Sequence, residues 1–177
     1  DAELWIDNRT LYVQARSRRS SGSVTFTYGK DLLELSVLAD LAHQRTSIRI
    51  TGWDVGAKET IEEEAGAGVI QAELGGRRAG SAVLEALSPR VERIATSVPL
   101  SREEARKLAE ARYRRRARGF VRAQGMVDGS VRLRVGTTIE LAKVGPLFEG
   151  PYYVTLARHT FDVLNGYRTT FLAERAG

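Results

Sequence analysis

Apolar residues recur at helical spacing between residues 101 and 120. The positions that carry this pattern are Ala105, Leu108, Ala109, Tyr113, Ala117 and Phe120. Ser101 precedes Glu104 at the spacing of a capping box, in which the serine hydroxyl accepts a hydrogen bond from a backbone N–H of the first turn. The pattern therefore predicts a helix over residues 101–117.

Beyond Arg118 the helical spacing gives way to alternation of apolar and polar residues. The alternating runs are Phe120–Val121, Leu133–Val135, Ile139–Leu141, Tyr153–Ala157 and Tyr167–Phe171. Turn-forming pairs separate these runs, namely Asp128-Gly129, Gly145-Pro146, Gly150-Pro151 and Asn165-Gly166. Short alternating runs divided by such pairs are typical of antiparallel strands, so we expect a β-meander behind the helix.

The first third of the chain also alternates. Leu4–Ile6 and Leu11–Val13 flank the turn-like residues Asp7–Arg9, which predicts a hairpin. Strand-like alternation continues over residues 24–28 and 32–37 and again before Trp53. These patterns indicate a first β-rich unit over residues 1–65.

A glycine-rich stretch follows the first β unit. Its glycines are Gly66, Gly68, Gly75, Gly76 and Gly80. A short apolar helical turn at residues 82–87 is stopped by Pro89, and residues 91–97 have the character of a strand that would join the second β unit. We therefore expect a connecting segment with a short helix at 66–90, followed by a second β unit at 91–177.

Composition narrows the class of protein. The chain is 42% apolar and 28% charged, which is typical of a folded protein. It contains no cysteine, which excludes disulfides, thiolate metal sites and a thiol nucleophile, and no apolar run approaches the roughly 20 residues that span a bilayer. The chain opens on Asp1 instead of methionine, so we expect a processed product or a fragment that is incomplete at its N-terminus.

The net charge is +5, and part of the positive charge lies in an arginine cluster at the end of the predicted helix. Its members are Arg112, Arg114, Arg115, Arg116 and Arg118. Arginines interleaved with an aromatic residue can contact phosphates and stack on bases. Cations near a helix C-terminus also complement the helix dipole, and the same side chains can face an acidic partner subunit. The helix dipole explains the cluster better than nucleic-acid binding does, because no fold-specific nucleic-acid signature accompanies the charge.

No residue pattern predicts catalysis. His43 and His159 lie in different β units, and no nucleophile motif accompanies them. Glu62–Glu64 could supply a carboxylate pair for glycoside cleavage, but adjacent glutamates beside glycines are more often a solvated face. Metal-ligand spacing and phosphate-binding glycine loops are absent from the sequence. We therefore predict no catalytic, cofactor-binding or metal-binding residue.

Several segments together resemble the phage late control protein D family, the VgrG-like baseplate hub group of contractile tails and related injection systems. The N-terminal segments are Phe26–Val37 and Ala39–Asp54. The C-terminal ones are Val98–Ala105, Arg118–Phe120, Arg134–Gly136, Phe148–Thr155, His159 and Gly166–Phe171. The resemblance spans nearly the whole chain, and none of its pieces is a catalytic signature.

The resemblance implies a mainly β fold of two related small β-barrel domains, with one or two helices and with the helix at 101–117 packed on the second barrel. It implies a homotrimer that forms a ring between a tail tube and a spike, in a virion tail baseplate or an injection particle assembled in the bacterial cytoplasm. Arg112, Arg114, Arg115 and Arg116 would then face a neighbouring subunit or the tube lumen, where passing DNA is the one nucleic acid expected. Neither a membrane nor a cofactor is expected.

Two alternatives stay open beside the structural role. One is a cell-wall-degrading hub enzyme, and the other is a basic nucleic-acid-binding β-barrel module. Trp53, Tyr152 and Tyr153 are candidate core or interface anchors. Since the two tyrosines are adjacent on a predicted strand, only one of them can point into the core.

Overall fold

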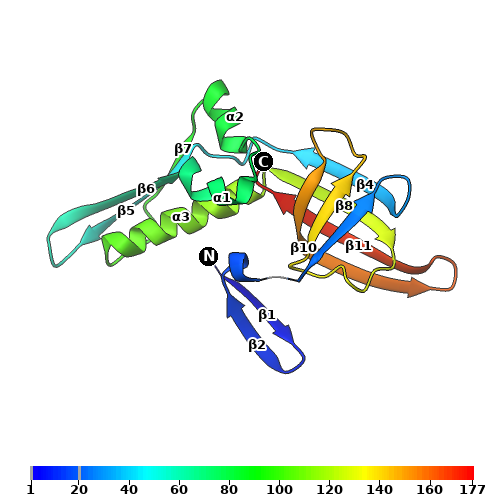
Figure 1. Cartoon of the computed structure of the whole chain (residues 1–177). Helices are drawn as coiled ribbons and strands as arrows, with labels where there is room; N and C mark the ends of the chain where they lie inside the picture. The colour runs from blue at the N-terminus through cyan, green and yellow to red at the C-terminus, as the bar shows by residue number, and fades with distance from the viewer. Residues whose placement is uncertain (1, 20) are drawn as a thin grey trace. The chain divides into compact units, whose positions relative to one another are not determined.

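The computed structural model describes residues 2–19 and 21–177, which form mostly strands with a few helices (Figure 1). The chain divides into two compact units. Unit 1 comprises the residues up to Leu38 together with Arg122–Glu174, and unit 2 comprises Ala39–Val121 together with the C-terminal residues Arg175–Gly177. The predicted β-rich α+β class is confirmed.

These units do not follow the predicted boundaries 1–65, 66–90 and 91–177. Each unit is assembled from strands that lie far apart in the sequence. Strand β3 (Ser23–Thr27), for example, pairs in parallel with β9 (Thr138–Ala142). Local alternation identifies strands but carries no information on such distant pairing. For this reason the prediction from the sequence divided the chain into an N-terminal and a C-terminal unit.

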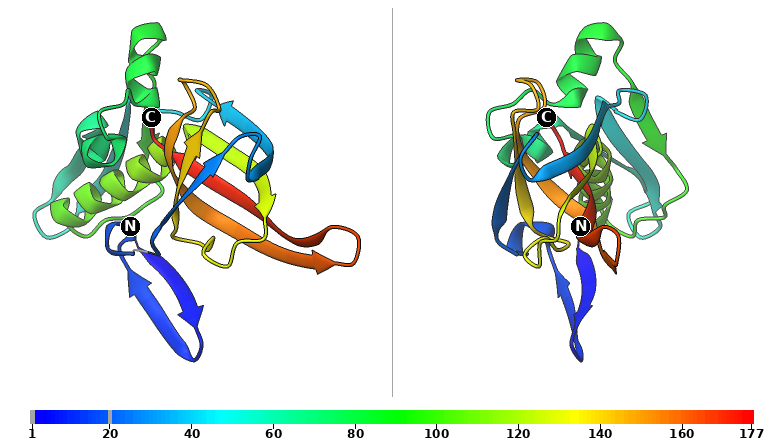
Figure 2. Two further views of the ribbon diagram at one scale, coloured as in Figure 1. Left: turned by 45° about the vertical axis from the view of Figure 1, so that its right-hand side comes forward. Right: turned by 90° about the vertical axis from the view of Figure 1, so that its right-hand side faces the viewer.

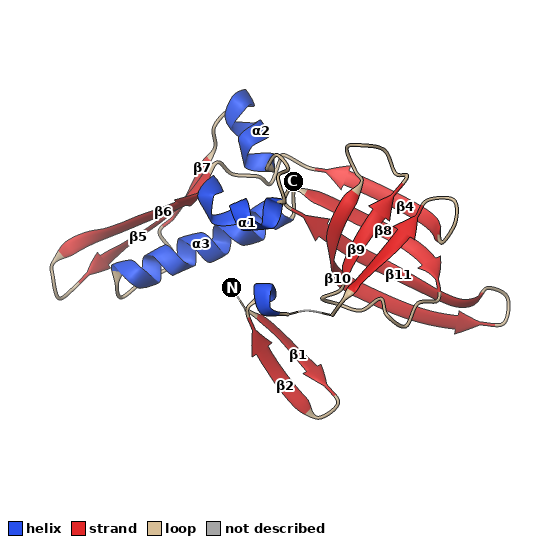
Figure 3. Ribbon diagram, in the orientation of Figure 1, coloured by secondary structure: helices blue, strands red, loops and turns tan. Residues whose placement is uncertain are grey.

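Unit 1 is built on a six-stranded sheet in the order β3-β9-β10-β11-β8-β4 (Figure 3). The four strands not yet introduced are β4 (Leu32–Ala39), β8 (Val121–Asp128), β10 (Gly150–Asp162) and β11 (Gly166–Arg175). Buried apolar side chains alternate along them and form the core of the unit. Tyr152 is 1% exposed and its hydroxyl donates to the carbonyl of Phe148, whereas Tyr153 is half-buried on the opposite face, as the sequence predicts for adjacent tyrosines.

The sheet of unit 1 is strongly curled. The rings of Phe26 on β3 and Phe171 on β11 stack with their centroids 6.4 Å apart. Strands β9 and β10 lie between β3 and β11 in the sheet, so in a flat sheet these residues would be roughly 14 Å apart. The edge strands β3 and β4 are joined by a turn at residues 28–31, which a flat sheet would not permit. The sheet therefore forms a partly closed barrel.

A separate two-stranded hairpin opens unit 1. It consists of β1 (Glu3–Asp7) and β2 (Thr10–Gln14) and confirms the predicted hairpin. Asn8 in its turn has φ 54°, a conformation that asparagine tolerates better than most residues. A short 3-10 helix, η1 (Arg16–Arg18), follows the hairpin.

Unit 2 combines a three-stranded sheet with a long helix (Figure 1). The sheet has the order β6-β5-β7, from β5 (Ser47–Asp54), β6 (Glu59–Gly66) and β7 (Val91–Ile94). Helix α3 (Arg102–Arg118) packs on β5 and β6. Its contact stripe repeats every fourth residue and consists of Ala105, Ala109, Tyr113 and Ala117. The small alanine side chains let the helix backbone approach the sheet closely.

The start of α3 agrees with the predicted capping motif. The Ser101 hydroxyl accepts from the backbone N–H of Glu104 at 3.2 Å, and the Glu104 carboxylate accepts from the backbone N–H of Leu100 at 2.8 Å. Two backbone donors at the start of the helix are thereby satisfied. The sheet beneath the helix contains β5 and β6, which the sequence analysis assigned to the first β unit instead of the second.

The segment expected as a connector belongs to the core of unit 2. It contains η2 (Ala67–Ile70), α1 (Gln71–Leu74) and α2 (Gly80–Leu87), and its Ile70 and Leu74 are 0% and 4% exposed. Gly75 adopts φ 58° and ends α1, so this glycine is a helix terminator and not a linker residue. The glycines are evident in the sequence, but the burial of Ile70 and Leu74 between them depends on tertiary contacts and could not be predicted from it.

Two predicted strands differ in the structure. Leu133 and Arg134 are irregular and Val135 begins a turn, in place of the predicted strand, although Leu133 is fully buried. Strand β7 pairs in parallel with β5 of unit 2 and does not join the meander strands. The apolar residue at Leu133 reflects burial and not strand formation. For β7 the strand itself was predicted correctly, but its pairing partner depends on tertiary contacts that local alternation does not contain.

Gly125 on β8 generates the first prediction. A Cβ at this position would lie 2.7 Å from the backbone carbonyl oxygen of Glu34 and 2.7 Å from Cζ of Phe171. Gly125→Ala should therefore lower the free energy of unfolding by about 2 kcal/mol, measured by urea denaturation, because the backbone must shift. Gly68→Ala is the control, since its Cβ would meet nothing within 4 Å. Equal denaturation midpoints for the two variants would contradict the close approach.

The ion pair at the end of α3 generates the second prediction. The Arg118 guanidinium donates to both carboxylate oxygens of Glu73 at 2.7 and 2.6 Å, and its side chain is 8% exposed. Glu73→Gln keeps the shape but removes the charge, so it should cost about 2 kcal/mol of stability in thermal denaturation. This is below the usual cost for a fully buried pair because Glu73 is 35% exposed. Glu85→Gln, at an exposed position of α2, should change nothing measurable; an equal loss in both variants would refute the role of the pair.

Candidate functional site

The arginine cluster of α3 is divided by its local partners. Arg114 pairs with Glu110 one turn earlier at 3.4 Å, and Arg116 pairs with Glu92 on β7 at 3.1 Å. Glu92 also receives Arg45 at 3.4 Å, so one carboxylate serves two guanidinium groups. These arginines are engaged in holding unit 2 together.

Arg112 and Arg115 differ from the other members of the cluster. Within residues 2–19 and 21–177, neither makes an ion pair or a side-chain hydrogen bond. Arg115 is exposed and Arg112 is half-buried. Of the four predicted contact residues, these two therefore keep their charge available for another molecule.

The glutamate run on β6 does not form an acid/base pair. Arg49 on β5 lies between Glu62 and Glu64, at 2.9 and 2.7 Å. Hydrogen bonds from the Ser47 hydroxyl and the Arg49 guanidinium hold the pKa of Glu64 below its usual value. A general acid requires the opposite shift, so the geometry does not fit the glycoside hydrolase alternative. Glu63 alternates to the other face of the strand.

Both histidines have hydrogen-bond partners of a structural kind. His43 lies 2.8 Å from Asp40, three residues earlier in the same loop, and its side chain is 66% exposed. His159 lies 2.9 Å from the Tyr167 hydroxyl and 3.1 Å from the Thr169 hydroxyl across the β10–β11 pair. The partners of His159 orient its ring on the sheet and do not include a carboxylate.

The described residues contain neither a cluster of metal ligands nor a helix suited to span a membrane. No three His, Cys, Asp or Glu side chains of that part gather where they could hold a metal ion. None of its helices combines the length and the apolar character needed to cross a bilayer.

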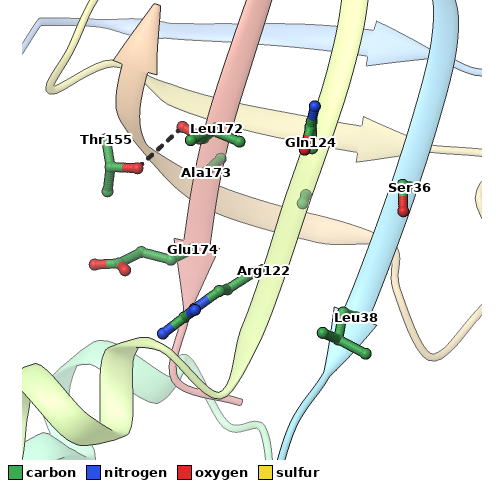
Figure 4. Close-up of a pocket in the computed structure, with 9 residues that line it drawn as sticks. Ser36, Leu38, Arg122, Gln124, Thr155, Leu172, Ala173 and Glu174 are labelled. Carbon is green, nitrogen blue, oxygen red and sulfur yellow. Dashed lines mark hydrogen bonds between the residues drawn. The ribbon is translucent and has the colours of Figure 1, made fainter.

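A groove in unit 1 was not predicted from the sequence (Figure 4). It has a volume of about 490 Å³ and runs over the outer face of the sheet beside the edge strand β4. Its side chains include Leu38 on β4, Arg122 on β8 and Glu174 on β11. Thr155 lies at an irregularity in the pairing of β10 with β11, and its hydroxyl donates to the Leu172 carbonyl at 3.2 Å. The groove thus lies beside a sheet edge, a place where an extended protein segment can add to a sheet.

Unit 1 also carries two exposed apolar surfaces. The first, here called the aliphatic face, lies on the β1–β2 hairpin and consists of Leu4, Ile6, Leu11 and Val13. The second, here called the apolar tip, lies at the end of the β10–β11 arm and consists of Phe161, Val163 and Leu164. Sequence alternation predicts that Leu4 and Ile6 share one face of a strand, and likewise Leu11 and Val13, but it does not reveal that this face is uncovered. Trp53, predicted as an anchor, is 53% exposed on β5 of unit 2.

Comparison with solved structures identifies the fold. The chain is similar to the 43 kDa tail protein of prophage MuSo2 from Shewanella oneidensis, with a TM-score of 0.68 and 13% identity over 99% of this chain and 51% of that protein. It is also similar to the tail protein from Neisseria meningitidis MC58, with a TM-score of 0.58 and 9% identity over 99% of this chain and 51% of the other. The chain thus spans about half the length of these proteins.

A third similar structure comes from the virion of a native gene transfer agent particle. The TM-score is 0.51 and the identity 14%, over 93% of this chain and 34% of that one. At such low identity the likeness establishes a shared fold, which agrees with the sequence resemblance to tail proteins.

Sequence comparison gives the family. The sequence has no significant match among curated proteins. The sequence model of the Alg8 N-terminal domain matches residues 3–162, which is most of the chain and includes strands of both units. The chain therefore belongs to the Alg8 N-terminal domain family.

Proposed function

We propose that the chain is a structural component of a phage tail or of a phage-derived contractile injection particle. The observation that carries this proposal is the fold match, in which 99% of the chain aligns with half of a prophage tail protein at a TM-score of 0.68. A fold shared over the whole chain supports a shared role better than a local motif would, although a fold can host several functions.

The finer proposal is a baseplate hub of the late control protein D type. In this role the chain is non-enzymatic and forms a homotrimeric ring that joins the tail tube to the spike, with DNA as a passenger in the lumen. It would be assembled in the bacterial cytoplasm and reside in the tail baseplate of the particle. The low pKa of Glu64 and the structural partners of the histidines favour this role over a cell-wall hydrolase.

Open sheet edges support assembly. In the described residues, β3 and β4 end the sheet of unit 1, β6 and β7 end that of unit 2, and the β1–β2 hairpin has no third strand. Edge strands present unpaired backbone groups and are a liability for a protein that works alone. A ring of identical subunits offers a use for them.

The third prediction concerns the mass of the assembled chain. A hub subunit should form a stable trimer in solution, measured by sedimentation or by light scattering at several protein concentrations. Trimers are less frequent than dimers among symmetric oligomers, so this result would be informative. A chain that remains a monomer or forms a twofold dimer at all concentrations would contradict the hub role.

The fourth prediction concerns the two arginines without partners. We propose that Arg112 and Arg115 face a neighbouring subunit or the lumen. Arg115→Glu should then weaken assembly about tenfold, with the loss reduced at high salt, because rim charges act through screened attraction. Lys58→Glu is the control, since Lys58 is exposed in the β5–β6 turn. If Arg115→Glu abolishes binding to DNA and leaves assembly intact, the nucleic-acid alternative replaces the subunit contact.

A further inference from the structure

The two open edges of the unit 2 sheet carry opposite charges on one face. Strands β6 and β7 lie on opposite sides of β5 and end this sheet within the described residues (Figure 2). β6 carries Glu62 and Glu64 on the face away from the core, and the strand register puts Arg93 of β7 on the same face. This face of the sheet is therefore acidic along one edge and basic along the other.

Arg93 lies beside another arginine. In the strand register, Arg49 on β5 has Glu64 on one side and Arg93 on the other. Arg93 is exposed, and among the described residues no side chain forms an ion pair or a hydrogen bond with it. Like charges on neighbouring strands repel each other. A carboxylate on the open side of β7 would compensate this repulsion.

The acidic edge has the opposite surplus. Glu62 and Glu64 share one guanidinium, that of Arg49, and their side chains are 50% and 41% exposed. Hydrogen bonds from the Ser47 hydroxyl and from Arg49 are the main causes of the low pKa of Glu64, and the charge of Arg93 across β5 contributes least. The β6 edge can thus accept a further cation from its open side.

We infer that β7 of one copy of this chain pairs with β6 of the next copy, so that Arg93 lies beside Glu62 and Glu64 of its neighbour. The inference rests on the proposed self-assembly and names the edges that would join. β6 runs antiparallel to β5 and β7 runs parallel to it, so a second β6 beside β7 would be antiparallel to β7 and would continue the sheet. Such a contact is head-to-tail, the class of contact from which cyclic rings are built.

Charge favours a second copy in this arrangement over other occupants of the two edges. A twofold contact of β7 with β7 would bring two Arg93 side chains together, and one of β6 with β6 would bring the glutamates of two copies together. An acidic strand of another protein would suit β7 but would leave the β6 edge open. The head-to-tail contact covers both edges and places opposite charges side by side.

Charge reversal tests the contact. Arg93→Glu should raise the protein concentration needed for assembly about tenfold, because the new carboxylate would face Glu62 and Glu64 of the neighbour. Its thermal midpoint as an isolated subunit should not fall, since the change removes the like charge beside Arg49. Arg78→Glu, at an exposed position of unit 2, is the control and should leave assembly unchanged. Equal assembly of the two variants would overturn the inference.

Cross-linking tests the strand pairing itself, without background because the chain has no cysteine. Val91→Cys and Gly66→Cys are made in separate copies of the whole chain, one of which carries a mass tag. The dilute subunits are mixed, concentrated and treated with a short bismaleimide. Both positions lie on the face of Arg93, and a Cβ at Gly66 would have no contact shorter than 3.4 Å. The mixed cross-linked dimer should be about tenfold more abundant than the self-linked dimer of either variant.

A control on the same strand tests the register. Thr60→Cys replaces Gly66→Cys, because Thr60 is exposed on the same face of β6 but lies roughly 20 Å further along the strand. It should give little mixed cross-link with Val91→Cys. Equal yields from the two positions of β6 would overturn the inference.

The outcomes separate the contact from the proposed function. A trimer by mass that gives no mixed cross-link overturns the inference and leaves the hub role in place. A mixed cross-link in a chain that forms no trimer supports the contact and contradicts the trimeric ring. Self-linked dimers of Val91→Cys or Gly66→Cys in excess of mixed ones would indicate a twofold contact and overturn the inference.

Discussion

The short connection between β3 and β4 constrains the whole of unit 1. These strands occupy opposite edges of the six-stranded sheet, yet only residues 28–31 join them. The sheet must therefore curl, and the stacked Phe26 and Phe171 fill the interior that the curl creates. Gly125 lies beneath Phe171, where a larger side chain would meet both the ring and the neighbouring backbone. Twist, glycine placement and aromatic packing are thus consequences of one closure condition.

Charge in this protein is largely used internally. Arg118, Arg116 and Arg49 each pair with a glutamate of unit 2, and Arg19 holds Glu3 in unit 1. These pairs cancel one positive and one negative charge each, so the net charge stays at +5, but fewer arginines are available to a partner than the 27 Lys and Arg residues of the sequence suggest. The sequence shows the arginine cluster of α3 but not which of its arginines form ion pairs. Glu92, the partner of Arg116, is distant in the sequence and is brought close to it by the β5–β7 pairing.

Local patterns predicted what local forces determine. The β1–β2 hairpin, the Ser101 cap and the strand at Ile139–Leu141 follow from turn chemistry, capping and alternation, and all three are present. The parallel pairing of β3 with β9 has no local signature, so the division of the chain into units was missed. The glycines before α2 suggested a connector, because glycine is common both in linkers and at helix ends, and only the buried Ile70 and Leu74 distinguish the two.

The groups of unit 1 whose pKa values are shifted lie beside its exposed apolar surfaces. An active site is recognised by convergent polar groups with shifted pKa values, whereas the two described groups of unit 1 with shifted pKa values, Tyr153 and Asp162, form hydrogen bonds that stabilise local structure. Both support the two apolar patches: Tyr153 helps hold the hairpin, and Asp162 fixes the turn of the apolar tip. The hydrogen bonds of Tyr153 and Asp162 therefore stabilise the two segments of unit 1 that expose apolar side chains. Uncovered apolar surface of this kind is unfavourable in water, which agrees with the proposed role of the chain as a component of an assembly.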